Sequence, residues 1–192
     1  MITPLGGNPS PDWSDQRLVD ACLRGDSEAW CALIGKYKRL IYSIPIKFGL
    51  SREDASEVFQ QVCLRMLSQL GGLRNPTCLP AWLMKVTSSQ CLELSRQQAR
   101  YAEINNKVIG TIAETRTIET VLRECEKEQI VREAIHAVQP RCKELIHLLF
   151  FESPPPSYEE TARRLNVAAG SIGFIRMRCL KKLRRSLEEK GF

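Results

Sequence analysis

The feature that most constrains the fold of this chain is a helical repeat of apolar residues over residues 51–70. The apolar side chains recur there at alternating steps of three and four, which places them on one stripe of an α-helix. They are Ala55, Val58, Phe59, Val62, Cys63, Met66, Leu67 and Leu70. Ser51 with Asp54 is typical of a capping box at the start, and Gly71-Gly72 can close the helix. The segment is therefore predicted to be one long amphipathic helix.

The same period recurs on both sides of this segment, and no strand pattern appears. Three further helices are predicted before residue 100; Pro45 is expected to kink or end the second, and Pro80 suits the first turn of the last. Residues 1–13 are rich in Pro, Gly, Asn and Ser, which predicts a flexible leader. Residues 14–100 are therefore expected to form a four-helix domain.

The remainder of the chain is predicted to be a second helical domain. Over residues 101–119 the apolar stripe weakens and Asn, Gly and Thr residues interrupt it, which favours a linker. Helical periodicity returns over residues 120–192. The predicted fold class is all-α, with two small helical domains joined by a linker and a helix-turn-helix in the C-terminal domain.

Composition excludes several classes of protein. No run approaches the roughly 18 apolar residues that span a membrane, and the N-terminus lacks the basic and apolar regions of a secretion signal. We therefore expect a cytoplasmic protein with no membrane span. The eight cysteines include no CxxC pair and only two histidines accompany them, so we expect no metal, no disulfide and no cofactor. Most of the cysteines are interpreted as small buried apolar residues.

The most specific motif is a helix-turn-helix pattern over residues 157–185. Ser157 and Glu160 are typical of a capping box, Asn166 suits the turn, and a second helix is expected from Gly170. Eight Lys or Arg against two Glu concentrate positive charge in this stretch of a chain whose net charge is +6, which suits contacts with phosphates. In a helix-turn-helix the second helix enters the major groove of DNA.

Two groups of residues on this second helix are predicted to contact duplex DNA. Outward-facing residues near its start are candidates for reading bases: Ser171, Gly173, Phe174, Arg176 and Arg178. Basic residues further along are candidates for phosphates, which fix position without reading sequence: Lys181, Lys182, Arg184 and Arg185. On the pattern alone, a solvated helical hairpin with a basic face is the alternative interpretation.

Together with two motifs in the first half of the chain, the helix-turn-helix pattern resembles the extracytoplasmic-function (ECF) sigma factors of bacterial RNA polymerase. The resemblance covers residues 15–187. The segment DASEVFQQV, residues 54–62, resembles the family's D-x-x-D/E-x-x-Q motif, which docks on the polymerase clamp. The resemblance implies that four residues bind polymerase: Asp54, Glu57, Gln60 and Gln61. Gln61 departs from the family pattern, which usually has an acid there. By themselves the two glutamines fit a solvated helix face equally well.

Residues 73–100 are similar to the family's promoter-melting element, in which a loop and an Ala-Trp-Leu helix capture bases of the minus-ten element. The resemblance implies that the melted strand is contacted by Arg74, Asn75, Lys85, Ser88, Ser89 and Arg96. Trp82 lies in the same segment, either packed in the core or facing the DNA. Basic residues and stacking surfaces suit single-stranded DNA.

By the same resemblance the helix-turn-helix is the fourth sigma region, which binds the minus-thirty-five element as duplex. Gly173, Phe174 and Ile175 replace the family's usual polar triplet. Base reading is then expected to fall to Arg176 and Arg178, or to contact between Phe174 and thymine methyl groups.

The function implied by the resemblance is promoter-specific transcription initiation. The expected partners are core RNA polymerase and promoter DNA, both as duplex and as melted strand, and the family also allows for an anti-sigma factor. No HExxH, GxGxxG or P-loop motif is present, so the chain is not expected to be an enzyme. The alternative is a stand-alone helix-turn-helix regulator whose N-terminal half dimerises or senses a ligand.

Overall fold

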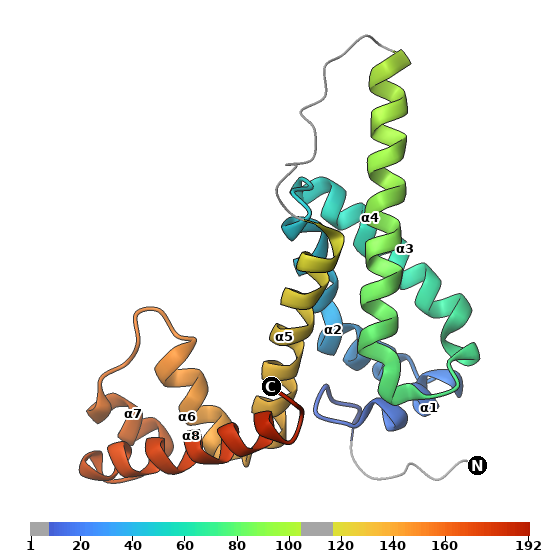
Figure 1. The fold of residues 1–192 in the computed structure, drawn as a ribbon. Coiled ribbons are helices and arrows are strands. Elements are labelled where there is room, and N and C mark those ends of the chain that lie inside the picture. The colour runs from blue at the N-terminus through green and yellow to red at the C-terminus, as the bar shows by residue number, and fades with distance from the viewer. Residues whose placement is uncertain (1–7, 105–116) are drawn as a thin grey trace. The chain divides into compact units, whose positions relative to one another are not determined.

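The computed structural model describes residues 8–104 and 117–192, and those residues form eight α-helices, three short 3-10 helices and no strand (Figure 1). The all-α prediction is confirmed. The chain divides into two units, Met1–Glu126 and Lys127–Phe192. Residues 1–7 of the predicted leader and residues 105–116 of the predicted linker lie outside the described residues.

The first unit is built on four helices: α1 (Asp15–Leu23), α2 (Ser27–Lys47), α3 (Arg52–Gln69) and α4 (Leu79–Ile104). Short 3-10 turns, η1 (Leu70–Gly72) and η2 (Pro76–Cys78), connect α3 to α4. Pro45 lies inside α2, which ends two residues later at Lys47, so the proline stands close to the helix end as its missing N–H and ring sterics favour. The predicted capping box is present, because Ser51 and Asp54 exchange side-chain to backbone hydrogen bonds.

Most of the predicted stripe of α3 lies in the core of this unit, but Leu67 does not. Val58, Val62 and Met66 are almost wholly buried, together with large residues of α2 such as Tyr37. The prediction for Leu67 is wrong: its exposed fraction is 62%, and Leu64 beside it is 58% exposed. A residue directly after buried Met66 is turned about 100° around the helix axis, beyond the edge of the buried stripe.

Residues 8–13, which were predicted to belong to a flexible leader, are attached to the first unit. Lys36 of α2 donates to the carbonyl oxygen of Trp13 at 2.9 Å and to the Asp15 carboxylate at 2.7 Å. The guanidinium of Arg17 lies 3.4 Å from the centroid of the Trp13 ring, which is a cation–π contact. This part of the chain is therefore held by specific side-chain contacts.

The start of α5 (Ile118–Ala137) also belongs to the first unit, where residues from 120 onward were predicted to open the second domain. Val121 and Cys125 are buried in the same core cluster as α1 to α4, and Leu122 packs against it. The Cys125 sulfur lies 3.9 Å from the Ser43 hydroxyl of α2. The division between the units accordingly falls within α5.

The second unit contains the rest of α5, α6 (Pro140–Phe150), α7 (Tyr158–Leu165), the 3-10 turn η3 (Ala169–Ser171) and α8 (Ile172–Glu188). Its core gathers Leu145, Ala162, Leu165 and Ile172. Asn166 ends α7 in the left-handed conformation with φ of 51°, as a short polar side chain permits at a tight turn. The α7, turn and α8 arrangement is the predicted helix-turn-helix.

The expectation that no disulfide forms is wrong for this unit. Cys142 of α6 and Cys179 of α8 are bonded, with 5.2 Å between their Cα atoms. The two cysteines stand 37 positions apart, and only the packing of α8 on α6 brings them together. The other six cysteines are not disulfide-bonded: Cys22, Cys31, Cys63, Cys78, Cys91 and Cys125.

Candidate nucleic-acid interface

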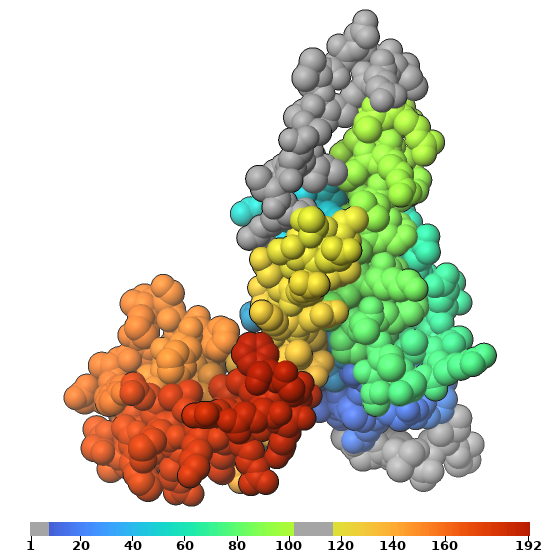
Figure 2. Space-filling view, viewed as in Figure 1, coloured from blue at the N-terminus to red at the C-terminus, as the bar shows by residue number. Residues whose placement is uncertain are grey.

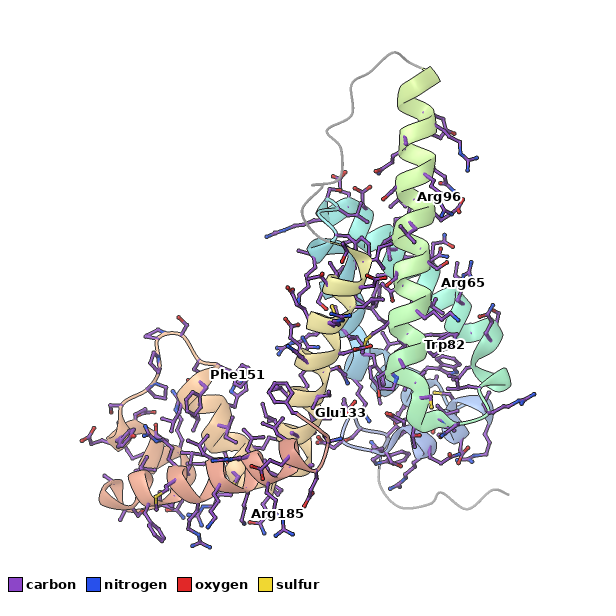
Figure 3. All side chains as sticks on the ribbon, in the orientation of Figure 1. Arg65, Trp82, Arg96, Glu133, Phe151 and Arg185 are labelled. Atoms are coloured by element: carbon purple, nitrogen blue, oxygen red, sulfur yellow. A yellow bond between two sulfur atoms is a disulfide. The ribbon has the colours of Figure 1, made fainter. Side chains whose placement is uncertain are left out.

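The helix α8 presents a basic face, and all six of its predicted Arg and Lys contacts are exposed. Acids of the same helix partly balance this charge at the C-terminal end. Arg184 donates to Glu188 at 2.8 Å and Arg185 donates to Glu189 at 3.1 Å. These are exposed i,i+4 pairs that phosphate can replace, because such pairs contribute only a few tenths of a kcal/mol, about 0.3–0.5. Figure 3 shows Arg185 on this helix.

The beginning of α8 carries an aromatic and cationic cluster. Phe174 is 58% exposed, and the Arg178 guanidinium lies 5.6 Å from its ring centroid. Arg176 donates to the hydroxyl of Tyr158 at the start of α7, at 3.0 Å. Ser171 donates its hydroxyl to the Ala168 carbonyl at 2.6 Å, so this side chain is engaged in the turn. Phe174 and Arg178 are thus brought together at the outer surface, Arg176 is held by Tyr158, and Ser171 is committed to local structure.

The helix α7 is fixed beneath this cluster by its own cap and ion pairs. Ser157 accepts from the Glu160 amide at 3.2 Å, and Arg164 links Glu160 to Glu152 with contacts of 2.9 and 3.0 Å. The hydrogen bond from Arg164 lowers the pKa of the Glu160 carboxyl below its usual value. These contacts orient α7, which in turn sets the position of Tyr158.

On α4, the predicted strand-binding residues divide into exposed and buried ones. Lys85, Ser89 and Arg96 are exposed and line a groove of about 510 Å³. Ser88 is only 5% exposed and donates its hydroxyl to the Met84 carbonyl at 2.8 Å, so direct contact by Ser88 is disfavoured. Trp82 is half-buried and packs against the core of the first unit (Figure 3). Of the two interpretations of Trp82, the structure favours packing.

The loop before α4 holds the two remaining candidates for the melted strand. Arg74 is exposed. The Asn75 side-chain oxygen accepts from the Thr77 amide at 3.0 Å and from the Thr77 hydroxyl at 2.7 Å, which caps η2. Asn75 therefore shapes the loop, and Arg74 is its outward-facing cation.

The predicted polymerase-docking residues lie on α3 and differ in availability. The Asp54 carboxylate caps α3 and also accepts from Gln98 of α4 at 2.8 Å. Glu57, Gln60 and Gln61 are exposed, and Glu57 and Gln61 line a shallow polar groove of about 200 Å³ between α3 and α4. Asp54 thus positions α3 against α4, whereas the other three remain accessible.

Sequence reasoning missed the apolar continuation of this face. Leu64 and Leu67 stand four and seven positions after Gln60, a spacing that puts them on the same side of α3. Both are more than half exposed. Exposed leucines next to polar residues on one helix face are typical of a protein-binding surface. Hydrophobic periodicity could not identify this surface, because it assigns Leu67 to the buried stripe and gives Leu64 no role.

Two buried cysteines outside the disulfide are poorly suited to bind a metal. Burial raises the pKa of the Cys22 thiol to about 11 and that of Cys91 to about 12, which disfavours the thiolate that binds metals. Within residues 8–104 and 117–192, no group of three His, Cys, Asp or Glu side chains could hold a metal ion. None of the described helices is both long and apolar enough to span a membrane.

Comparison with known proteins finds a family match within the first unit. Residues 33–101 match the sigma-70 region 2 family. The RNA polymerase sigma-H factor of Pseudomonas aeruginosa is 29% identical over 72 residues, which are 38% of this chain and 37% of that protein. The chain thus matches little more than a third of that relative's length.

Two further relatives match over most of the chain. RNA polymerase sigma factor SigV of Bacillus subtilis is 22% identical over 157 residues, 82% of this chain and 90% of that protein. ECF RNA polymerase sigma factor SigM of Mycobacterium tuberculosis is 22% identical over an alignment of 199 residues, 100% of this chain and 95% of that protein.

The chain thus combines a match to sigma-70 region 2 in its first unit with a helix-turn-helix in its second. Residues 33–101 belong to the sigma-70 region 2 family, and over most of its length the chain is similar to RNA polymerase sigma factors, one of them of the ECF type.

Proposed function

We propose that this chain binds core RNA polymerase through the exposed face of α3 and directs initiation by dividing promoter recognition between its two units. The observation that carries the proposal is the face itself: Glu57, Gln60 and Gln61 are exposed and continue into Leu64 and Leu67 within the matched region 2. A polar stretch followed by an apolar one supplies both orientation and buried area to an interface. Polymerase and promoter DNA are then the partners, in the cytoplasm, and the chain makes and breaks no bond itself.

In this proposal the first unit holds the melted minus-ten strand along α4. Arg74, Lys85 and Arg96 supply positive charge to the strand backbone, and Ser89 adds a hydrogen-bonding group. Asn75 and Trp82 support this surface from the loop and the core, and Ser88 is not a direct contact. Cations on the protein release counterions from the nucleic acid, so this binding should weaken as salt rises.

The second unit grips duplex DNA with α8. Phe174 and Arg178 form the outward cluster that enters the major groove, where the Phe174 ring can contact a thymine methyl group and Arg178 a guanine edge. Gly173 leaves space for close approach of the helix, since a Cβ there would meet nothing within 4 Å. Lys181, Lys182, Arg184 and Arg185 contact phosphates. An anti-sigma factor is a further partner, bound through surfaces that compete with polymerase.

The docking proposal is tested by Gln60→Ala with Gln61→Ala, measured as affinity for core polymerase. Both side chains are exposed, so the fold should be retained while polymerase binding weakens. Gln69→Ala is the matched control, because Gln69 is an exposed glutamine at the end of the same helix. Equal affinity of the double variant and the control would remove the docking surface from α3. A stable dimer that binds palindromic DNA without polymerase would instead favour a stand-alone regulator.

A further inference from the structure

The start of α5 is seated on the first unit beside the surface proposed to hold the melted strand. Val121 is 1% exposed and Cys125 is 0% exposed, both within the core of that unit. Cys125 lies 3.9 Å from the Ser43 hydroxyl of α2, and Glu124 lies 3.5 Å from the Lys47 ammonium of the same helix. Figure 2 shows the first turns of α5 in contact with α4. The start of α5 is therefore held on the first unit by a small buried stripe, Val121 and Cys125, and by the ion pair between Glu124 and Lys47 at its edge.

Other residues of the same α5 turns form one wall of a groove along α4. Leu122 and Glu126 line it from α5, opposite Lys85, Ser89 and Arg96. Its volume of about 510 Å³ is that of a small-molecule site, which spans roughly 300–1,000 Å³. A protein that binds single-stranded DNA contacts several consecutive nucleotides, and these would not fit in a groove of this volume.

The acidic side chains in this groove also oppose binding of a DNA strand. The cations that would meet a phosphate backbone share the groove with the Glu126 carboxylate, and Glu93 of α4 adds a second acid. An acid in this place offsets the attraction of Lys85 and Arg96 for a polyanion. The α5 turns thus provide both a steric and an electrostatic obstacle to a strand.

We propose that residues 118–126 are an internal competitor of the melted strand: when seated they close the strand-binding face of α4, and they leave it when promoter DNA is opened. The inference rests on the proposed role of α4 in strand binding. A seat with two buried side chains is small enough to open reversibly, because the hydrophobic contribution scales with the apolar area buried. Apparent strand affinity then falls with the fraction of unseated molecules.

The direct test is a disulfide that holds the start of α5 against α2. Ser43→Cys places a second thiol beside Cys125, within reach of a disulfide after side-chain rotation. Ser43→Cys with Cys125→Ala is the matched control, which carries the same first change and cannot form the bond. Both full-length chains are oxidised mildly, assembled with core polymerase and titrated with a labelled single strand carrying the minus-ten sequence of a promoter found by transcription in vitro. We expect the locked chain to bind polymerase normally and to lose most strand binding, with recovery on reduction.

A second pair of variants tests the role of charge without any disulfide. Glu126→Lys reverses the charge in the groove, and Glu119→Lys makes the same change at an exposed position of α5 that does not line it. Strand affinity should rise more for Glu126→Lys than for Glu119→Lys. Equal affinities of the two variants would contradict the electrostatic role of Glu126.

The outcomes separate this inference from the function on which it rests. If no disulfide forms in Ser43→Cys, the inference is overturned. It is also overturned if the disulfide forms and strand binding is unchanged. If Lys85→Ala with Arg96→Ala weakens strand binding in that case, the strand surface of α4 stands. If the lock and the double alanine variant both leave strand binding unchanged, the assignment of α4 is itself wrong and the inference falls with it.

Discussion

The disulfide between Cys142 and Cys179 allows a stability prediction for the second unit. The pair closes a loop with a sequence separation of 37 residues, which spans α7 and the turn of the helix-turn-helix. In the chain-entropy model, a loop of this length restricts the unfolded state by about 4 kcal/mol. A domain the size of residues 127–192 has a free energy of unfolding of only about 3–10 kcal/mol. Replacing both cysteines by alanine should therefore remove a large part of the stability of this unit.

The expected effect is a fall in the midpoint of thermal unfolding on the order of 15 °C or more, since each kcal/mol shifts a domain of this size by about 4–8 °C. The assay compares two probes on the oxidised full-length chain. Circular dichroism reports helices of both units, whereas tryptophan fluorescence reports the first unit alone, because all three tryptophans lie there: Trp13, Trp30 and Trp82. The dichroism transition of the second unit should move while the fluorescence transition stays in place.

The matched control is Cys31→Ala, which removes an exposed free thiol of the first unit. It should unfold like the parent chain. A shift of less than about 5 °C in the double variant would show that the crosslink does not restrict the unfolded chain as the loop-entropy model requires.

Three further predictions concern DNA reading, helix capping and thiol chemistry. Arg176→Ala should weaken duplex binding by about 1–3 kcal/mol at one base position if this arginine reads a base. Lys181→Ala should weaken binding to all DNA sequences alike and reduce the dependence of log affinity on log salt concentration by about one. Titrations of DNA variants at several salt concentrations measure both effects. Ser51→Ala should lower the free energy of unfolding by about 1 kcal/mol through loss of the capping box, as chemical denaturation would show, and an unchanged midpoint would contradict it. Cys91, whose pKa burial raises to about 12, should resist alkylation by iodoacetamide at neutral pH while exposed Cys31 reacts; mass spectrometry of the native chain reports this, and equal labelling would disprove the buried position.

The helices and the helix-turn-helix could be predicted because their signals are local. The capping pair Ser51 and Asp54, the stripe through Val58 and Val62, and the left-handed Asn166 each act over a few residues of chain. Leu67 shows the limit of this reasoning: the helical period gives a direction around the axis, but only the packed neighbours decide how wide the buried stripe is.

What the sequence could not predict depends on contacts between distant segments. Cys142 and Cys179 become partners only when α8 packs on α6, and spacing alone does not define connectivity. Val121 and Cys125 fit the apolar face of a second-domain helix, yet they are buried in the first unit. Among the candidate site residues, the exposure of Lys85, Arg96 and Gln60 agrees with their predicted roles, whereas burial of Ser88 follows from how α4 lies on its neighbours.

The central claim, that this chain directs RNA polymerase to promoters, is tested most directly by transcription in vitro from a genomic DNA library with purified core enzyme, with and without the chain. We expect discrete new start sites that share two upstream sequence blocks, and loss of those transcripts with Gln60→Ala and Gln61→Ala. An active core enzyme that yields no new start sites in the presence of the folded chain would contradict the account.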